Sequence, residues 1–301
     1  MSLPRISVIT PSFNQAKFLE KTIESVLSQG YPNLEYIVID GGSTDGSVEI
    51  LERWSDKLTY WISEPDSGHG EALNKGFARS TGDLMCWLNS DDMYYPWTLE
   101  VVAEIFAQFQ EVEWIVGFNT WWNDRGQVTF GQRAPKNIFD YLIGNFGWIQ
   151  QESVFWRRPL WNRVGAKIDQ SYKLMVDGEL WSRFFLEAPL YTIDCALAGY
   201  RVHGANRAGA YYEQCVVEMH RAIADMELRC SSETLSTANR LRTAKRLATI
   251  SLLRHLPVSQ VASRLLSSDY ERASYHNLTY RGGRWQTRRI PFTVTPNKYG
   301  D

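Results

Sequence analysis

The chain has 301 residues, of which 44% are hydrophobic, and its 32 basic side chains nearly balance its 34 acidic ones. This length and apolar content suffice for one large domain with its own core and an added segment. The four cysteines lie far apart, which excludes a paired-cysteine zinc site, and no stretch reaches the ~18 apolar residues of a membrane-spanning helix. Because a strand begins at once, with no apolar N-terminal segment behind a basic lead, we expect a cytoplasmic protein.

Strands and amphipathic helices alternate over the first third of the chain. The strands are predicted at 6–10, 36–39, 59–62 and 84–88. The helices are predicted at 16–29, 48–54 and 71–79. Near-continuous apolar strands that alternate with helices indicate an α/β fold, in which an open, mainly parallel sheet is covered by helices on both faces.

Two adjacent carboxylates, Asp91 and Asp92, follow the apolar strand at 84–88. Adjacent carboxylates repel each other and are costly to bury unless a positive group lies beside them. Divalent cations such as Mg²⁺ are held by one or two such carboxylates, usually together with substrate phosphates. A second interpretation is that one Asp is the N-cap of the helix predicted after Pro96.

Polar side chains follow each predicted strand: Asn14, Asp40, Asp66, Asp91 and Asp92. Ligands of open parallel sheets bind beyond the carboxyl ends of the strands, so these side chains should gather at one site. The chain lacks both the Gly-x-Gly-x-x-Gly pattern after its first strand and the Gly-x-x-x-x-Gly-Lys phosphate loop. A metal clamp is therefore favoured over a phosphate cradle, because a cation can neutralise a leaving diphosphate.

Four segments, in order and in spacing, resemble the motifs of the family 2 glycosyltransferases: 9–14, 39–46, 66–76 and 88–92. The resemblance extends over about residues 6–207 and implies the GT-A fold. It implies an inverting, hexosyltransferase-type enzyme that moves a sugar from a nucleotide-diphosphate sugar, with a UDP-sugar favoured, to a hydroxyl of a glycan, lipid-linked or other acceptor. The implied cofactor is Mn²⁺ or Mg²⁺, and the implied setting is the biosynthesis of polysaccharide, lipopolysaccharide or another glycoconjugate.

The same resemblance implies roles for individual residues. Asp40 would contact the base or ribose, Asp92 would ligate the cation, and Asp91 would touch the ribose or the cation. Ser90 stands where many relatives carry Asp. The full set of implied donor-binding residues is Pro11, Ser12, Asn14, Asp40, Asp66, Asn74, Lys75, Ser90 and Asp91. The segment 200–203 resembles the late motif whose histidine approaches the metal, which makes His203 the second candidate ligand, although a structural role for this histidine is also open.

The acceptor side is expected in two later segments. Residues 150–158 resemble the family's strand before the acceptor-side helix, and residues 175–183 resemble its acidic motif, which implies that Asp177 is the general base. A sugar hydroxyl is a poor nucleophile at neutral pH, so a carboxylate within hydrogen-bond reach is needed to take its proton. Asp177 is alternatively the N-cap of a helix. Glu179 competes for the role, but two residues along a helix it should point away from Asp177.

Charge divides the chain unevenly, with 18 basic and 28 acidic residues over 1–220 against 14 and 6 over 221–301. We predict a catalytic domain at 1–210, made of a nucleotide-sugar half at 1–95 and an acceptor half at 96–210. A basic helical extension follows at 211–301. Either this extension meets anionic lipid at the inner face of the membrane, or its leucines pack on the catalytic domain or on a second copy in a homo-oligomer. We favour packing, since charge runs are usually solvated faces. No nucleic-acid motif accompanies the charge, so nucleic acid is not an expected partner.

Aromatic residues are dense between the two halves, and seven tryptophans are expected mainly in the core: Trp114, Trp121, Trp122, Trp148, Trp156, Trp161 and Trp181. A hairpin with its turn at 123–126 is predicted, and its tip is a candidate for acceptor contacts. Two other function classes stay open. One is a nucleotide-sugar or carbohydrate-binding protein without turnover; the other is a sugar nucleotidyltransferase, which needs a basic, Gly-rich loop after the first strand that 11–14 does not offer.

Overall fold

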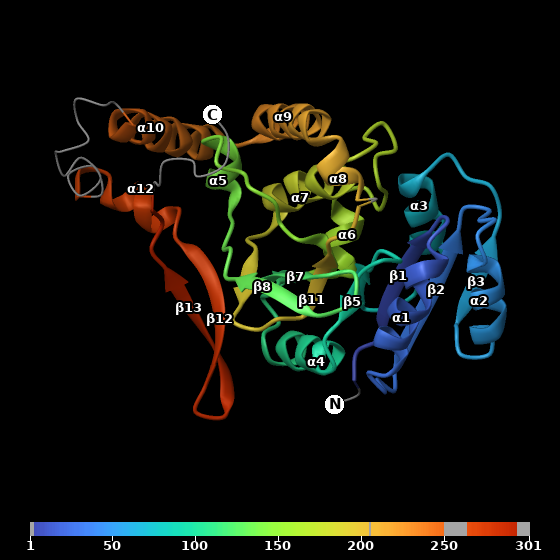
Figure 1. Ribbon diagram of the computed structural model, residues 1–301. Coiled ribbons are helices and arrows are strands. Elements are labelled where there is room, and N and C mark those ends of the chain that lie inside the picture. Colours follow the sequence, from blue (N-terminus) through green and yellow to red (C-terminus); the bar gives the residue numbers. More distant parts are fainter. Residues whose placement is uncertain (1–2, 205, 250–263, 294–301) are drawn as a thin grey trace.

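The computed structural model describes residues 3–204, 206–249 and 264–293, and Figure 1 shows a central sheet with helices packed on both of its faces. Within these residues the main sheet has nine strands in the order β13-β12-β10-β6-β9-β4-β1-β2-β3. Its strands are β1 (Ile6–Ser12), β2 (Leu34–Asp40), β3 (Tyr60–Ser63), β4 (Leu84–Trp87), β6 (Trp114–Val116), β9 (Val154–Arg157), β10 (Tyr191–Ile193), β12 (Tyr275–Arg281) and β13 (Arg284–Ile290). A second sheet, in the order β5-β11-β7-β8, contains β5 (Met93–Tyr94), β7 (Asn119–Trp122), β8 (Val128–Gln132) and β11 (Ala198–Arg201).

Helices connect most of these strands. In the first half they are α1 (Ala16–Leu27), α2 (Ser47–Trp54), α3 (His69–Arg79), α4 (Thr98–Gln108) and α5 (Ile138–Leu142). The later ones are the 3₁₀ turn η1 (Gln151–Ser153), α6 (Arg158–Arg163), α7 (Val176–Glu187), α8 (Arg207–Ala210), α9 (Tyr212–Arg229), α10 (Ser232–Thr249) and α12 (Ser267–Arg272).

The predicted alternation of strands and helices in the first third of the chain is confirmed. Strand β1 pairs in parallel with β2 and β4, and β2 pairs in parallel with β3. In this register Ser12 lies opposite Asp40, and Asp40 lies opposite Ser63. The carboxyl ends of these strands therefore meet at one edge of the sheet, as the predicted fold class requires. Strand β9 runs antiparallel between β4 and β6, so the sheet is mainly but not wholly parallel.

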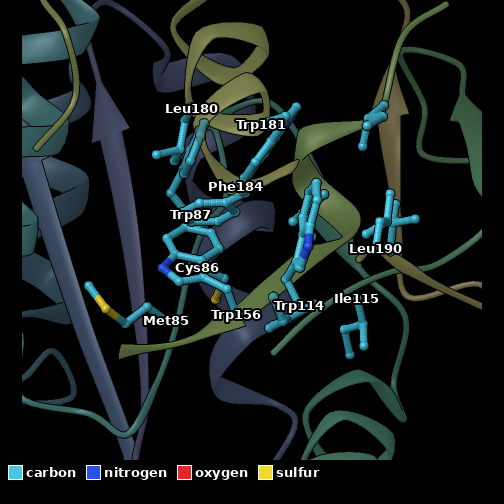
Figure 2. Close-up of a cluster of buried hydrophobic side chains, with 14 of the residues drawn as sticks. Met85, Cys86, Trp87, Trp114, Ile115, Trp156, Leu180, Trp181, Phe184 and Leu190 are labelled. Atoms are coloured by element: carbon cyan, nitrogen blue, oxygen red, sulfur yellow. The ribbon is translucent and has the colours of Figure 1, made fainter. Parts of the chain in front are cut away.

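A tryptophan cluster joins α7 to the sheet. The ring of Trp181 on α7 stacks on Trp87 of β4 at a centroid distance of 5.6 Å and on Trp114 of β6 at 5.7 Å. Figure 2 shows these rings with Trp156 and Phe184 in one buried group between the sheet and the helix. The predicted core role holds for five of the seven tryptophans, whereas Trp121 is half-buried and Trp148 is exposed. Because Trp181 lies one turn after Asp177, this stacking fixes the helix that carries the predicted base.

The C-terminal extension is helical over 212–229, 232–249 and 267–272, but residues 275–290 form a β hairpin where a helical extension was predicted. Gly282 and Gly283 both have positive φ, which suits the two-residue turn between β12 and β13. Strand β12 pairs in parallel with β10 and thus lengthens the main sheet. The leucine-rich part of the predicted helical pattern at 250–263 lies outside the described residues. Among the helices that the structure describes, none combines the length and the apolar character needed to cross a bilayer.

The extension packs on residues 1–210, as the favoured interpretation expected. Helix α9 lies against α7 (Figure 1), and five of its side chains are buried: Cys215, Met219, Ala222, Ile223 and Met226. The indole of Trp285 on β13 is buried and donates a hydrogen bond to Glu104 of α4 at 3.1 Å. The hairpin and α9 therefore cover separate parts of the catalytic domain.

Candidate active site

The loop after β2 is organised by the carboxylate of Asp40, which is fully buried. Asp40 accepts hydrogen bonds from the backbone N–H groups of Gly42 (3.1 Å) and Ser43 (2.8 Å) and from the hydroxyls of Ser43 (2.5 Å) and Ser63 (2.7 Å). These four donors all belong to the protein, so the carboxylate shapes the loop in this structure. The implied contact between Asp40 and a nucleoside stays a prediction.

The loop after β1 is bonded to the loop after β2. Asn14, with φ at +51°, accepts a hydrogen bond from the N–H of Thr44 at 2.9 Å and donates its own N–H to the hydroxyl of Ser43 at 2.7 Å. Pro11 and Ser12 are buried at the end of β1. Among the described residues, the Ser12 hydroxyl has no hydrogen-bond partner, which leaves it available to a ligand. The two loops thus form one preshaped edge.

Of the other residues predicted to bind the donor, Asp66 lies at this edge, whereas Asn74 and Lys75 interact with other residues of the protein. Asp66 lies against Gly41, where an added Cβ would stand 3.0 Å from an Asp66 carboxylate oxygen. The amide of Asn74 bonds both the N–H (2.8 Å) and the C=O (3.0 Å) of Ile168. Lys75 forms ion pairs with Glu64 at 2.9 Å and Glu71 at 3.0 Å. Donor contacts by Asn74 and Lys75 stay predictions, while in the structure Asn74 links the donor side of the chain to residue 168.

The predicted metal residues Asp91, Asp92 and His203 are brought together by the link between β4 and β5 and by the end of β11. Ser90 and Asp92 are buried, and the threonine hydroxyl of Thr22 on α1 lies against the carbonyls of both, at 2.9 and 2.7 Å. His203 Nε2 lies 3.0 Å from Asp91 Oδ2, so the imidazole meets the first aspartate of the pair rather than the second. The N-cap of α4 is Trp97, so neither aspartate is the helix cap considered above.

Arg201 places a positive charge that interacts electrostatically with both Asp91 and Asp92, and no role was predicted for this residue from the sequence. It is fully buried, its backbone N–H donates to Asp92 Oδ1 at 2.8 Å, and its Nε donates to the Asp91 carbonyl at 2.5 Å. The guanidinium lies over the ring of Phe18 at 4.9 Å and also donates to the carbonyl of Asp124 at 3.3 Å. In the sequence, only the position of Arg201 within the late motif, two residues before His203, indicated that it lies near the site.

The residues at this point fit a divalent cation that shares its coordination with a substrate. Burial raises the pKa of Asp92 well above its ordinary value, and the charges of Asp91 and Glu152 raise it further. A bound cation relieves such a cost, and carboxylate oxygen with neutral imidazole suits Mn²⁺. Over the part of the chain that the structure describes, no three His, Cys, Asp or Glu side chains are placed to hold an ion by themselves. Asp92 and His203, the predicted ligands, stay a prediction, and the acidic and imidazole groups at this point are of the kinds that bind such an ion.

Asp177 lies in the first turn of α7, whose N-cap is Met175, so Asp177 is not itself the N-cap. Burial raises the pKa of Asp177 to about 6, the charge of Glu218 raises it as well, and the backbone N–H groups of Gly178 and Asp177 oppose the rise. Glu179, the competing carboxylate, forms a two-fold ion pair with Arg183 in which both N–O distances are 2.7 Å. This pairing leaves Asp177 as the better placed proton acceptor.

Glu152 is a further acidic residue that the sequence did not single out, and it connects the two halves of the site. Burial raises the pKa of Glu152 to about 8, and the charges of both Asp177 and Asp91 contribute to the rise. One of its carboxyl oxygens, Oε1, is buried without a hydrogen-bond partner among the described residues. Glu152 thus interacts electrostatically with both the predicted base and the predicted metal motif. A glutamate inside the buried run 149–156 was the only signal in the sequence.

The predicted hairpin is confirmed as β7 and β8, closed by a hydrogen bond from Asn123 N–H to the Gln127 carbonyl. Arg201 joins its tip to the metal motif through the Asp124 carbonyl. A groove of about 840 Å³ lies beside the tip, and its lining includes Met93, which directly follows Asp92, and the cations Lys21, Lys57 and Arg125. Acceptor contacts at the tip stay a prediction.

Comparison with known proteins agrees with this geometry. Residues 7–174 match the family model described as glycosyl transferase family 2. An uncharacterized glycosyltransferase of Mycobacterium tuberculosis is 32% identical over 207 residues, which cover 67% of this chain and 77% of that protein. One of Rickettsia typhi is 29% identical over 218 residues, which cover 70% of this chain and 68% of that protein.

Two solved structures resemble the whole chain. Staphylococcus aureus TarS 1-349 in complex with UDP-GlcNAc has a TM-score of 0.57 and 15% identity, covering 96% of this chain and 99% of that one. The mannosyltransferase PcManGT from Pyrobaculum calidifontis, in complex with GDP-Man and Mn²⁺, has a TM-score of 0.53 and 16% identity, covering 91% of this chain and 88% of that one. At such identities the likeness concerns the fold, and the expected GT-A fold is confirmed.

Proposed function

The chain belongs to glycosyl transferase family 2, and from this premise we propose that it moves a sugar from a nucleotide-diphosphate donor to an acceptor hydroxyl with inversion. One observation carries the proposal: Trp181, one turn after Asp177, stacks at 5.6 Å on Trp87 of β4, the strand that leads into the metal motif. The electrostatic interaction of buried Glu152 with both Asp177 and Asp91 supports it. A base close to a leaving-group site is what a single in-line displacement requires.

The chain's own residues supply most of the chemistry in this proposal. Asp177 takes the proton of the acceptor hydroxyl. At the same time the hydroxyl oxygen of the acceptor bonds to the anomeric carbon, and the bond from that carbon to the diphosphate oxygen breaks. The preshaped loops after β1 and β2 orient the nucleoside, with the carboxylate of Asp66 at that edge and the buried Ser12 hydroxyl, which has no hydrogen-bond partner among the described residues, at the end of β1. Asp92 and His203 would hold Mn²⁺ or Mg²⁺, an ion that neutralises charge on a departing diphosphate when it is bound.

For the donor we favour a UDP-sugar, with a GDP-sugar as the first competitor. Support comes from the two structural neighbours, since one was solved with UDP-GlcNAc and the other with GDP-Man and Mn²⁺. For the acceptor we propose a glycan or lipid-linked hydroxyl that enters by the groove beside the hairpin tip. A hexosyl donor, a role in polysaccharide or glycoconjugate biosynthesis and a peripheral membrane contact through the basic extension stay predictions from the sequence.

A thermal-shift panel of UDP-, GDP- and dTDP-sugars, with and without Mn²⁺ or Mg²⁺, tests the donor side. A donor at about 100 times its Kd adds about 2.7 kcal/mol to the free energy of unfolding, and we expect this gain only when metal is present. Asp92→Ala should lose the metal-dependent part, whereas Asp56→Ala, at an exposed carboxylate, should keep it. Full metal-dependent stabilisation of Asp92→Ala would overturn the ligand assignment. Donor stabilisation without any release of nucleoside diphosphate would favour a binding protein instead.

A further inference from the structure

Helix α7 begins without a cap of its own. Its N-cap, Met175, has φ and ψ of −112° and 45° and makes no side-chain capping hydrogen bond. The first N–H groups of a helix have no partner within the helix and need one from elsewhere. Because Asp177 lies in this first turn, whatever holds the start of the helix also fixes the carboxylate of the proposed base.

Glu218 of α9 holds the segment that leads into the helix. Its carboxylate accepts hydrogen bonds from three consecutive backbone N–H groups, those of Lys173 (3.0 Å), Leu174 (2.9 Å) and the N-cap residue Met175 (2.8 Å). Hydrogen bonds to an ionised acceptor are about twice as strong as neutral ones, and three on one carboxylate fix the chain direction into α7. Glu218 thus anchors the N-cap residue and the two residues before it.

Other residues on the same face of α9 fix the segment just before α7. Arg221 donates to the hydroxyl of Ser171 at 2.7 Å and lies over the ring of Tyr172 at 4.2 Å. The Tyr172 hydroxyl donates to Asp225 at 3.3 Å. The spacing of 218, 221 and 225 places these three side chains on one helical face.

The two helices also meet closely at the residue after the proposed base. A Cβ added to Gly178 would lie 2.1 Å from the sulfur of Met219, so glycine lets α9 approach the first turn of α7. Contacts at 171–175 and at 178 thus flank Asp177 on both sides.

We propose that Glu218 is a positioning residue for transfer: by anchoring residues 173–175 at the start of α7 from the C-terminal extension, it holds Asp177 where it can accept the acceptor proton. The proposal rests on the function of Asp177 proposed above and goes beyond the family match, which ends at residue 174. A displacement of about 1 Å at a reacting group lowers a rate by about 100-fold, so a modest shift of this turn is sufficient.

The variants Glu218→Gln, Glu218→Ala and Glu218→Asp test the role, with Glu213→Gln as the matched control at an exposed carboxylate of the same helix. UDP-GlcNAc and GDP-mannose are offered with Mn²⁺, and release of UDP or GDP is followed with water as the nucleophile. We expect kcat to fall about 10- to 100-fold in Glu218→Gln and Glu218→Ala with unchanged donor Kd, and Glu218→Asp to recover part of the loss. Amide hydrogen exchange at 173–178 should quicken in the same two variants, and exchange in α1 should not.

The acid limb of kcat is a further readout, because it reports the pKa of the carboxylate that accepts the proton. The titratable groups that interact electrostatically with Asp177 are Glu218 on α9, Glu152 on η1 and Tyr141 on α5. Removing the negative charge of Glu218 should move the limb to lower pH in Glu218→Gln.

Two results separate the proposals. The positioning role is overturned if folded Glu218→Gln and Glu218→Ala exchange amide hydrogens at 173–178 as slowly as the wild type. It is also overturned if their kcat equals that of the wild type. Asp177→Asn is measured alongside: if it keeps full activity, the proposed function itself fails. If Asp177→Asn is inactive while the Glu218 variants are fully active, only the positioning role fails. Should Glu218→Ala unfold, Glu218→Gln keeps the side-chain size, and its exchange and rate decide.

Discussion

Helices α1 and α7 carry the two sides of the site, and both begin without a side chain of their own as cap. For α1 the partner is Asp45, which accepts the N–H of Ala16 at 2.9 Å from the neighbouring loop. For α7 the partner is Glu218, which accepts from residues 173–175 across the interface with the C-terminal extension. The start of α1 is thus held by a residue of the neighbouring motif, whereas the start of α7 is held by a residue from a later part of the chain.

In the proposed function, donor binding and turnover therefore rest on separate supports. The loops at 12–14 and 40–46 are bonded to each other and to the start of α1, so they are shaped before any ligand arrives. The first turn of α7 has Trp181 stacked in the core on one side and Glu218 on the other. Changes to the extension should therefore affect the rate more than the affinity for the donor.

The largest effect is expected at the proposed base. Asp177→Asn keeps the shape of the side chain but removes proton acceptance, so kcat should fall by about 10³-fold while the donor Kd stays nearly unchanged. Release of nucleoside diphosphate and donor titration measure the two quantities. Glu179→Gln is the matched control on the same helix, because that carboxylate is engaged by Arg183, and it should keep most of the rate. Comparable losses in both variants would contradict the assignment of Asp177.

A second test concerns Arg201, which joins the metal motif to the hairpin. Arg201→Met removes the buried positive charge beside Asp91 and Asp92 and leaves two carbonyls unpaired, so the free energy of unfolding should fall by about 3 kcal/mol. Chemical denaturation measures the change. Arg125→Met, at an exposed arginine of the same hairpin, should cost far less. A loss of under about 1 kcal/mol in Arg201→Met would show that the carboxylates need no such partner.

The sequence predicted what local patterns encode. Strands and helices to residue 79 followed from apolar periodicity, and the rule that parallel strands end at one edge predicted the gathering of Asn14, Asp40 and Asp66 that the structure shows. The hairpin at 275–290 was missed because its arginines suggested a solvated helical face, although Gly282 and Gly283 mark the turn.

The supports of the site could not be predicted, because they join distant positions. Arg201 bonds Asp92 across 109 residues, and Glu218 bonds Met175 across 43. A single glutamate on an amphipathic helix usually faces solvent, so no pattern marked Glu218 as an anchor of α7. No sequence pattern marked Glu152 either, since only the fold lets it interact with both Asp91 and Asp177.

A third test uses pH on the base side. Since burial raises the pKa of Asp177 from its ordinary 3.8 to about 6, kcat should fall about tenfold for each pH unit below that value, as the carboxylate takes up its proton. Stability should move the other way. The folded state keeps this proton between pH 3.8 and about 6 while the unfolded state releases it, so the contribution of Asp177 to the free energy of unfolding falls as pH rises through that window. Asp177→Asn should remove both trends, and the difference from wild type isolates them from Asp140, whose pKa burial also raises to about 6.

The smallest effect is expected for Asp45→Ala, which tests whether Asp45 at the start of α1 and Glu218 at the start of α7 act on different steps. Asp45→Ala removes the acceptor for the N–H of Ala16 and for the N–H and hydroxyl of Ser47, so it should lower the free energy of unfolding by about 1 kcal/mol. Because Asp45 belongs to the loop that borders the nucleoside edge, the donor Kd should rise while kcat at saturating donor stays near wild type, the reverse of the pattern expected for Glu218→Gln. Asp56→Ala, an exposed carboxylate beyond the end of α2, serves as the control. If Asp45→Ala lowered kcat and spared the donor Kd, both carboxylates would act on the same step, and the division into a binding side and a turnover side would be wrong.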